Sequence, residues 1–156
     1  MSAVKLYTMC IVQNEKNEIL LINRPDKLGF PGYIGPGGKV DFPESLTEGA
    51  IREVWEETGL RVGDLEYKGL DEHIDPNENE RYMVFNYLAK TYEGELLDDA
   101  PEGEPRWVSV EQALKLPMQW WFKRRLPLFF EPGTFEIYTL YDNKSEQTLK
   151  ETIKEL

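Results

Sequence analysis

The sequence predicts a single layered domain of the α/β or α+β class, spanning residues 1–156, and three observations support this expectation. A chain of 156 residues suits one domain with a buried core. Short runs of β-branched and aromatic residues recur between turn-rich segments, a pattern typical of strands. Residues 46–58 instead repeat their apolar side chains with the period of a helix. Strands mixed with an amphipathic helix indicate layers of both kinds.

Two strands and a loop are expected in the first quarter of the chain. Residues 4–12, VKLYTMCIV, and residues 18–23, EILLIN, are rich in strand-forming side chains, and the polar stretch between them is expected to turn. Residues 25–38 hold five glycines and three prolines. Such a density of both residue types predicts an irregular loop over that range.

The expected helix has clear signals at both ends. Ser45 and Glu48 form the S-x-x-E pattern of a capping box, in which each side chain bonds a free backbone amide of the other residue. The helix is therefore expected to begin near Leu46. Gly59 is suited to the left-handed residue that follows a helix, so the helix is expected to end there.

The remaining elements follow from the same patterns, with one segment left open. Strands are expected at 63–73, 81–91 and 135–142, and short helices at 109–116 and 120–130. The tail at 147–155 fits two structures, because its apolar residues also recur at a helical spacing.

Composition and charge exclude several classes of function. The net charge of −11 argues against binding of a nucleic-acid polymer, although it does not exclude a nucleotide accompanied by divalent cations. No segment approaches the roughly 20 apolar residues of a membrane span, so no membrane partner is expected. The single cysteine, Cys10, permits no disulfide within the chain and is expected to be buried. With no charged leader before a long apolar core, these features predict a cytoplasmic location.

Residues 46–58 show two faces on a helical wheel. Five residues fall on a broad arc that is expected to face the core: Thr47, Ala50, Ile51, Val54 and Trp55. Glu53, Glu56 and Glu57 fall together on a neighbouring arc, in which Gly49 leaves a gap. A solvated acidic surface is the usual meaning of such a run of charges.

The acidic arc breaks two rules of helix stability at once. Glu53 and Glu57 are like charges four residues apart, and Glu56 and Glu57 lie at the end of the helix where the dipole disfavours anions. Local rules that are broken together often mark a functional site. Three carboxylates on one arc suit Mg²⁺ or Mn²⁺, and the glycine-rich approach supplies main-chain groups nearby.

Residues 38–60, GKVDFPESLTEGAIREVWEETGL, resemble the Nudix box. That pattern runs Gly, five residues, Glu, seven residues, Arg-Glu, an aliphatic residue, any residue, Glu-Glu, any residue, Gly and an aliphatic residue, and every fixed position matches. The resemblance implies an α/β/α sandwich around a mixed β-sheet, with the box as a loop–helix–loop. It also implies hydrolysis of nucleoside diphosphates that are linked to another moiety.

The resemblance implies a role for each polar residue of the box. The catalytic set would be Glu53, Glu56, Glu57, Arg52 and Glu44. Mg²⁺, or Mn²⁺ in its place, would be held by the three helix glutamates and the carbonyl of Gly37, while Arg52 orients the glutamates and Glu44 braces the loop. In this family a carboxylate from a later loop sometimes joins the metal site. Here Glu102 is the better candidate and Glu104 the poorer one, and a merely solvated acidic loop is the alternative.

Segments outside the box resemble the MutT-type, oxidised-purine nucleoside triphosphatase branch, among them LYTMCIV at 6–12 and PGYIGPGGKV at 31–40. The substrate-binding set that this implies is Thr8, Arg24, Leu28, Ile34, Gly38, Lys39, Trp120 and Trp121. Each tryptophan could stack on a purine or equally pack in the core. Ile34 stands where the vertebrate-type enzyme has asparagine, and WFKRR stands where that enzyme has adjacent aspartates, so the polar readers of the base are absent. His73 lies outside the motif and is not expected to be a catalyst.

The predicted function is divalent-metal-dependent hydrolysis of a nucleoside triphosphate to the monophosphate and pyrophosphate. The predicted role is sanitisation of the nucleotide pool in support of DNA repair, with 8-oxo-dGTP or a related purine as substrate. One alternative is the same chemistry on ADP-ribose or a dinucleoside polyphosphate. The other is a non-catalytic module that senses a nucleotide, which the complete set of box glutamates disfavours. The sequence leaves the oligomeric state open.

Overall fold

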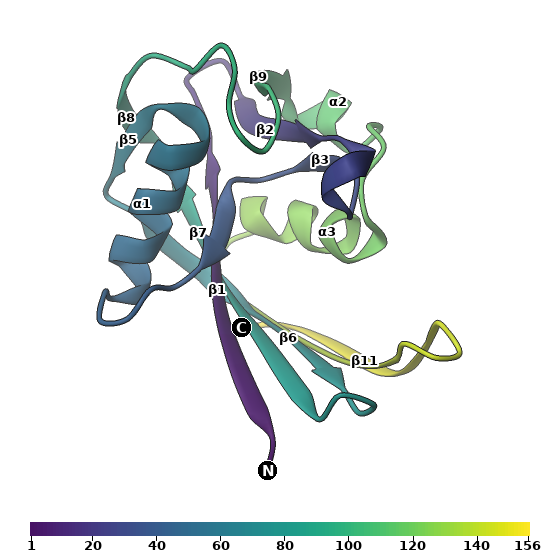
Figure 1. Cartoon of the computed structure of the whole chain (residues 1–156). Helices are drawn as coiled ribbons and strands as arrows, with labels where there is room; N and C mark the ends of the chain where they lie inside the picture. Colours follow the sequence, from purple (N-terminus) through teal and green to yellow (C-terminus); the bar gives the residue numbers. More distant parts are fainter.

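The computed structural model describes all residues, 1–156, and its main element is a six-stranded mixed sheet between two helices (Figure 1). The strand order is β11 (Gln147–Glu155), β10 (Phe135–Asp142), β6 (Glu66–Asp75), β7 (Glu80–Ala89), β1 (Ala3–Val12) and β4 (Gly37–Lys39). β1 is parallel to β7 and β6 to β10, whereas the other neighbours are antiparallel. α1 (Leu46–Thr58) lies on one side of the sheet and α3 (Trp120–Arg125) on the other. This arrangement confirms the expected α/β/α sandwich.

Smaller elements complete the two outer layers. A three-stranded sheet has the order β3 (Gly32–Ile34), β2 (Glu18–Arg24) and β9 (Pro105–Ser109), and a third sheet pairs β5 (Leu60–Gly63) with β8 (Thr91–Gly94). Three short helical segments are η1 (Asp26–Leu28), α2 (Val110–Ala113) and η2 (Leu126–Phe130). None of the helices has the length and apolar character needed to cross a membrane.

The core is divided by the central sheet into two clusters, one for each helix layer. Alternation along β1 explains the division, because successive side chains of a strand point to opposite faces. Met9 and Ile11 pack into the cluster that contains Phe122 of α3. Cys10 packs into the cluster that contains Val54 of α1, fully buried and unpaired as expected.

Most strands lie where the sequence predicts them, and the differences concern short elements. The predicted loop at 25–38 is wrong in part, because it contains η1 and two three-residue strands. The strand predicted at 63–73 corresponds to β6, which begins only at Glu66, and β5 precedes it as a separate strand. The helix predicted at 109–116 shortens to α2. The helix predicted at 120–130 changes into the 3₁₀ segment η2 after residue 125, where Pro127 lacks the amide that an α-helix would use. The open tail at 147–155 is a strand, because β10 offers it a free edge.

The expected core face of α1 is correct only in part. Ala50 and Val54 are buried, but Trp55 is 47% exposed and Thr47 is also exposed. Trp55 lies beside the guanidinium of Arg61, which is 5.2 Å from the centre of its ring. The core arc is therefore narrower than the wheel predicts, because a cation–π contact on the surface can hold a tryptophan without burying it.

Candidate functional site

The start of α1 is set by local hydrogen bonds that the sequence predicts. The Ser45 amide donates to Glu48 Oε1 at 2.9 Å, and the Glu48 amide donates to Ser45 Oγ at 3.1 Å, so both halves of the capping box are present. Gly59 ends the helix in the left-handed conformation, with φ of 86°. These caps decide where the helix begins and ends, and therefore which glutamates share a face.

Glycines in the approach loop admit the carboxylates of α1. A Cβ atom added to Gly38 would lie 2.6 Å from the carboxyl carbon of Glu53. The backbone amide of the neighbouring Gly37 donates to Glu57 Oε2 at 2.8 Å. Two glutamates of the helix are thus in contact with the β4 backbone, which a larger side chain at residue 38 would prevent.

Arg52 is the centre of the charged network beside these glycines. Its Nε and Nη2 atoms donate to the two carboxylate oxygens of Glu44 at 3.0 and 2.8 Å. Its Nη1 atom donates to Glu53 at 3.0 Å and to Glu56 at 3.1 Å. Nη2 also donates to the carbonyl of Lys39 at 3.0 Å. The guanidinium fork therefore ties the loop to the helix and orients two of the three glutamates.

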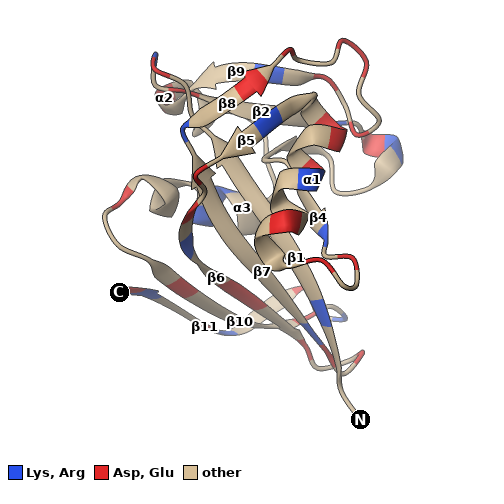
Figure 2. Ribbon diagram, turned by 90° about the vertical axis from the view of Figure 1, so that its left-hand side faces the viewer, with Lys and Arg blue, Asp and Glu red and all other residues tan.

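One further acidic residue in this network was not predicted. Asp41 Oδ2 lies 3.3 Å from Arg52 Nη2 in an ion pair. Its position inside the box but outside the fixed pattern gives no sequence signal for this contact. Figure 2 shows the result, in which acidic segments along α1 and the preceding loop surround a single basic position on the helix.

Burial and charge act differently on the carboxyl groups of this site. Hydrogen bonds from Arg52 and from the Asp41 amide lower the pKa of Glu44 to about 2. Burial instead raises the pKa of Glu53, and it raises the pKa of Glu57 to about 8. Glu57 thus forms no ion pair, and its carboxyl group is held by the backbone amide of Gly37 in β4.

The later acidic loop brings one of its two candidates to this place. Glu102 forms an ion pair with Arg24 Nη1, and both residues lie close enough to Glu57 to influence its pKa. Glu104 is exposed and makes no side-chain hydrogen bond or ion pair. The geometry therefore favours Glu102 over Glu104 as the additional carboxylate.

Comparison with known proteins agrees with this geometry. The NUDIX domain family matches residues 5–129 of the chain. A putative 8-oxo-dGTP diphosphatase of Bacillus subtilis (strain 168) is 32% identical over 124 residues, which cover 79% of this chain and 70% of that protein. The chain belongs to the Nudix family. An oxidized purine nucleoside triphosphate hydrolase of Danio rerio is 32% identical over 108 residues, covering 69% of this chain and 68% of that protein.

A solved Nudix structure resembles nearly the whole chain. The crystal structure of a MutT protein from Bacillus halodurans matches with a TM-score of 0.83 and 29% identity, over 96% of this chain and 97% of that protein. The Nudix resemblance of the box is thereby confirmed, and so is the MutT-like fold. The protein is a Nudix pyrophosphohydrolase, and this family generally uses divalent metal ions.

The Nudix glutamates fit a divalent ion by chemistry, although they do not converge on one point. No three acidic, histidine or cysteine side chains gather at ligating distance. Glu53 and Glu56 are instead turned to Arg52, and Glu57 to the Gly37 amide. The approach of Glu53 to Gly38 and the burial that raises the pKa of Glu57 nevertheless fit a divalent ion, since carboxylates removed from water need a counter-charge.

The predicted substrate-binding residues lie on both sides of the central sheet. Ile34 and Trp121 pack against the cluster of Met9, on the α3 side. Thr8 precedes Met9 in β1, so its side chain points to the opposite face of the sheet, the α1 side. It is buried, and its Oγ1 atom makes no hydrogen bond. The structure therefore does not bring Thr8 to the side chains of Ile34 and Trp121.

The other predicted substrate residues are near the surface. Trp120 is 41% exposed, with its ring 5.5 Å from that of Tyr141. Leu28 is exposed in η1, where its carbonyl accepts from Arg24 Nη2 at 2.8 Å. Lys39 is exposed at the end of β4. His73 lies in β6, with its ring 6.2 Å from that of Tyr82 and 5.6 Å from that of Tyr141.

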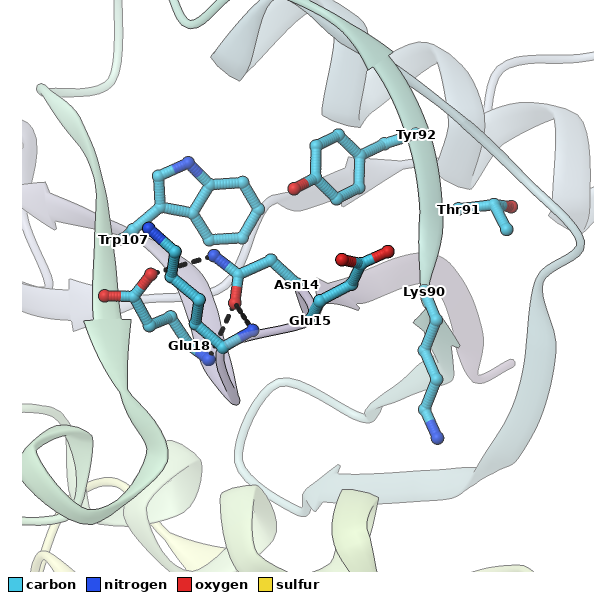
Figure 3. Close-up of a pocket in the computed structure, with 8 residues that line it drawn as sticks. Asn14, Glu15, Glu18, Lys90, Thr91, Tyr92 and Trp107 are labelled. Carbon is cyan, nitrogen blue, oxygen red and sulfur yellow. Dashed lines mark hydrogen bonds between the residues drawn. The ribbon is translucent and has the colours of Figure 1, made fainter.

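One cavity lies away from the Nudix helix. It has a volume of about 680 Å³ and lies between the turn that follows β1 and the paired rings of Tyr92 and Trp107, 5.3 Å apart (Figure 3). Asn14 spans the turn with hydrogen bonds to Lys16 and Glu18. None of the glutamates of α1 lines this cavity.

Proposed function

We propose that this Nudix protein hydrolyses purine nucleoside triphosphates to the monophosphate and pyrophosphate, with Mg²⁺ or Mn²⁺ as the cofactor. The observation that carries the proposal is the contact of Glu57 with the Gly37 amide, beside Glu53 in the space left by Gly38. It places two partly buried carboxylates against a glycine backbone that a polyphosphate chain can approach closely. Removal of oxidised purines from the nucleotide pool, in support of DNA repair, is the biological role that follows.

Each residue of the network has a separate part in this proposal. Glu53, Glu56 and Glu57 would hold the ion together with the carbonyl of Gly37. When bound, a divalent ion neutralises phosphate oxygens and lowers the pKa of the attacking water. Arg52 keeps the glutamates in place and Glu44 fixes Arg52, since a bidentate pair restrains both partners.

A carboxylate must also accept the proton of the attacking water. Glu57 and Glu102 lie close enough to interact electrostatically, and each is held by a bond to a separate element. Both are therefore candidates for the proton acceptor.

The choice of substrate is supported by the relatives. Those from Bacillus subtilis and Danio rerio are described as acting on 8-oxo-dGTP and on oxidised purine nucleoside triphosphates. Trp121 lies at the edge of the core on the α3 side, where one ring face could receive a purine. These points support 8-oxo-dGTP or a related purine nucleotide as the substrate of this chain.

A panel of nucleotides tests the proposal. Purified protein with Mg²⁺ is offered 8-oxo-dGTP, dGTP, dATP, dCTP, ADP-ribose and diadenosine tetraphosphate, and kcat/KM is measured from the separated products. We expect monophosphate and pyrophosphate from the purine triphosphates, at rates above that of dCTP. Faster turnover of ADP-ribose or the dinucleotide would reassign the substrate. Binding without any turnover would indicate a nucleotide sensor.

A further inference from the structure

Two consecutive arginines at the end of α3 carry their charges into the face of the central sheet. Arg124 Nη1 and Arg125 Nε each lie 2.9 Å from Asp71 Oδ2 of β6. The side chains of Asp71 and Arg125 are both only 3% exposed. Charges buried to this degree are tolerated when they are paired and when their hydrogen-bonding atoms find partners.

Arg124 meets that condition with all three of its nitrogen atoms. Nε donates to Glu151 at 3.1 Å, and Nη1 donates to Asp71 and to the carbonyl of Trp121, both at 2.9 Å. Nη2 donates to Thr139 at 2.9 Å. Arg124 is therefore a structural residue that links α3 to the strands β6, β10 and β11.

Arg125 does not meet the condition that all hydrogen-bonding atoms of a buried charge find partners. Its one well-formed hydrogen bond joins Nε to Asp71. Nη1 has only Met9 Sδ, which is a weak acceptor, and Asn86 Oδ1, each at 3.5 Å, a distance that is long for an oxygen acceptor. Nη2 has no hydrogen-bond partner. It is not completely enclosed, because Thr8 Oγ1 is the only completely enclosed side-chain nitrogen or oxygen without a partner. A largely buried cation thus keeps donors that are free to bond a ligand.

These free donors lie just across the sheet from the Nudix carboxylates. Met9, which contacts Nη1 of Arg125, pairs across β1 and β4 with Gly37, the residue that binds Glu57. The guanidinium also lies 5.5 Å from the ring centre of Trp121. One pair of strands therefore separates a site suited to phosphate from a cation beside an aromatic ring.

We propose that Arg125 determines base specificity by donating hydrogen bonds to the 6-oxo oxygen of a purine. This inference rests on the proposed function. A guanidinium only donates, so it matches the carbonyl at C6 of guanine and opposes the amino group at C6 of adenine. Because Asp71 already balances the charge, the site suits a neutral acceptor rather than another phosphate. Guanine and 8-oxoguanine share this oxygen, so both would be accepted.

The assignment also supplies a polar reader that the neighbouring residues lack. Ile34 packs against the same cluster as Met9 and Trp121, and its side chain can neither donate nor accept a hydrogen bond. Apolar shape alone discriminates between similar ligands by roughly 10- to 200-fold, whereas a site with dedicated donors can reject the wrong group more strongly. Arg125 is the group near Ile34 with donors free for this purpose.

Two nucleotides that differ at C6 test the proposal in the unmodified protein. Deoxyguanosine triphosphate and the triphosphate of 2,6-diaminopurine deoxyriboside share the 2-amino group and differ in the 6-oxo or 6-amino substituent. We expect kcat/KM to favour dGTP by about 5- to 150-fold, the range of a good base contact. Equal values for the two would overturn the proposal.

A pair of variants separates base reading from stability. Arg125→Lys keeps the charge beside Asp71 but cannot present a fork to two acceptors at once, so the ratio between the two nucleotides should fall toward one. Arg124→Lys is the matched control, because Arg124 has no free donor. It should lower the melting temperature while the ratio stays at the wild-type value. A ratio that changes only in Arg124→Lys would contradict the assignment.

A binding measurement keeps this inference separate from the proposed function. The affinities of dGMP and 2,6-diaminopurine deoxyriboside monophosphate are measured without metal, from the quenching of tryptophan fluorescence. If no triphosphate is hydrolysed but dGMP binds at least fivefold more tightly, the proposed function is lost and the role of Arg125 stands. Equal binding, or no binding of dGMP at millimolar concentration, would refute that role.

Discussion

The two charged regions of this protein lie on opposite sides of the central sheet and differ in their charge balance. On the α1 side, one cation, Arg52, serves four carboxylates: Asp41, Glu44, Glu53 and Glu56. On the α3 side, two arginines meet two carboxylates, Asp71 and Glu151. The first region has an excess of negative charge and the second has none. The first is therefore suited to a cation and the second to a neutral acceptor.

The pKa values and the hydrogen bonds support the same distinction. In the acidic region, burial raises the pKa of Glu57, which has no ion-pair partner, and also that of Glu53, in spite of its bond to Arg52. On the α3 side the charges are balanced, but one hydrogen-bond donor, Nη2 of Arg125, has no partner. A missing charge and a missing acceptor call for different ligands, and a nucleotide with its metal ion supplies both.

Removing one carboxylate from the acidic region should abolish most activity without harming the fold. We expect Glu57→Gln to lower kcat by on the order of 10²–10⁴-fold, as loss of a proton acceptor or ligand does. The melting temperature of the metal-free protein should stay equal or rise slightly, because Glu53 loses a like-charge neighbour. Glu15→Gln, in the exposed turn after β1, serves as the control. Activity within a few-fold of wild type at saturating Mg²⁺ would remove Glu57 from the site.

Replacing Arg52 by lysine, which keeps the charge but loses the planar fork, should have the next largest effect on turnover. Arg52→Lys cannot bond both oxygens of Glu44 and still reach Glu53. We expect turnover to fall by about 10- to 100-fold, as is typical when a residue that orients metal ligands is replaced. Unchanged kcat/KM in a purine triphosphate assay would mean that only the positive charge matters.

The two candidate carboxylates of the later loop form a natural pair of variants. Glu102 is held by Arg24 near Glu57, whereas Glu104 is exposed and unbonded. We expect Glu102→Gln to raise the Mg²⁺ concentration needed for half-maximal rate by roughly 10-fold, within the usual range for groups that support a metal site. Glu104→Gln should leave it unchanged. Equal responses of the two variants would indicate that the loop is only a solvated acidic surface.

A methyl group in the approach loop should weaken the acidic region alone. In Gly38→Ala the new Cβ would lie 2.6 Å from the carboxyl carbon of Glu53 and would displace it. We expect weaker Mn²⁺ binding, measured by calorimetry. Gly63→Ala is the matched control, since the nearest atom to its Cβ would be 3.7 Å away. A similar loss of affinity in both variants would point to a general loss of order.

The smallest effect concerns stability and pH. An exposed glutamate has a pKa of about 4.3, whereas burial raises that of Glu57 to about 8. Between these values the folded chain keeps a proton that the unfolded chain releases, so the free energy of unfolding of the metal-free protein falls as pH rises. We expect the melting temperature to fall from pH 5 to pH 8, and to fall less in Glu57→Gln. Identical pH profiles would show that Glu57 is not buried in solution.

The α1 side could be predicted from the sequence because its determinants lie close together in the chain. The capping box, the terminal glycine and the spacing of Glu53, Glu56 and Glu57 all fall within fifteen residues. Helical geometry then decides which side chains share a face. The same local logic failed for Trp55, because a wheel cannot show where the neighbouring strand ends or that Arg61 would cover the ring.

Only the tertiary structure could decide the α3 side. Asp71 and Arg125 are separated by 54 residues, and parallel pairing of β6 with β10 together with the packing of α3 brings them together. In the sequence, WFKRR is only a run of basic residues after a tryptophan. No rule of spacing predicts that all nitrogens of Arg124 find hydrogen-bond partners while Nη2 of Arg125 does not. Local hydrogen bonds and periodicity therefore determined the Nudix helix. The partners of a buried charge depend on which distant strands meet, and that is decided by the packing of the whole domain.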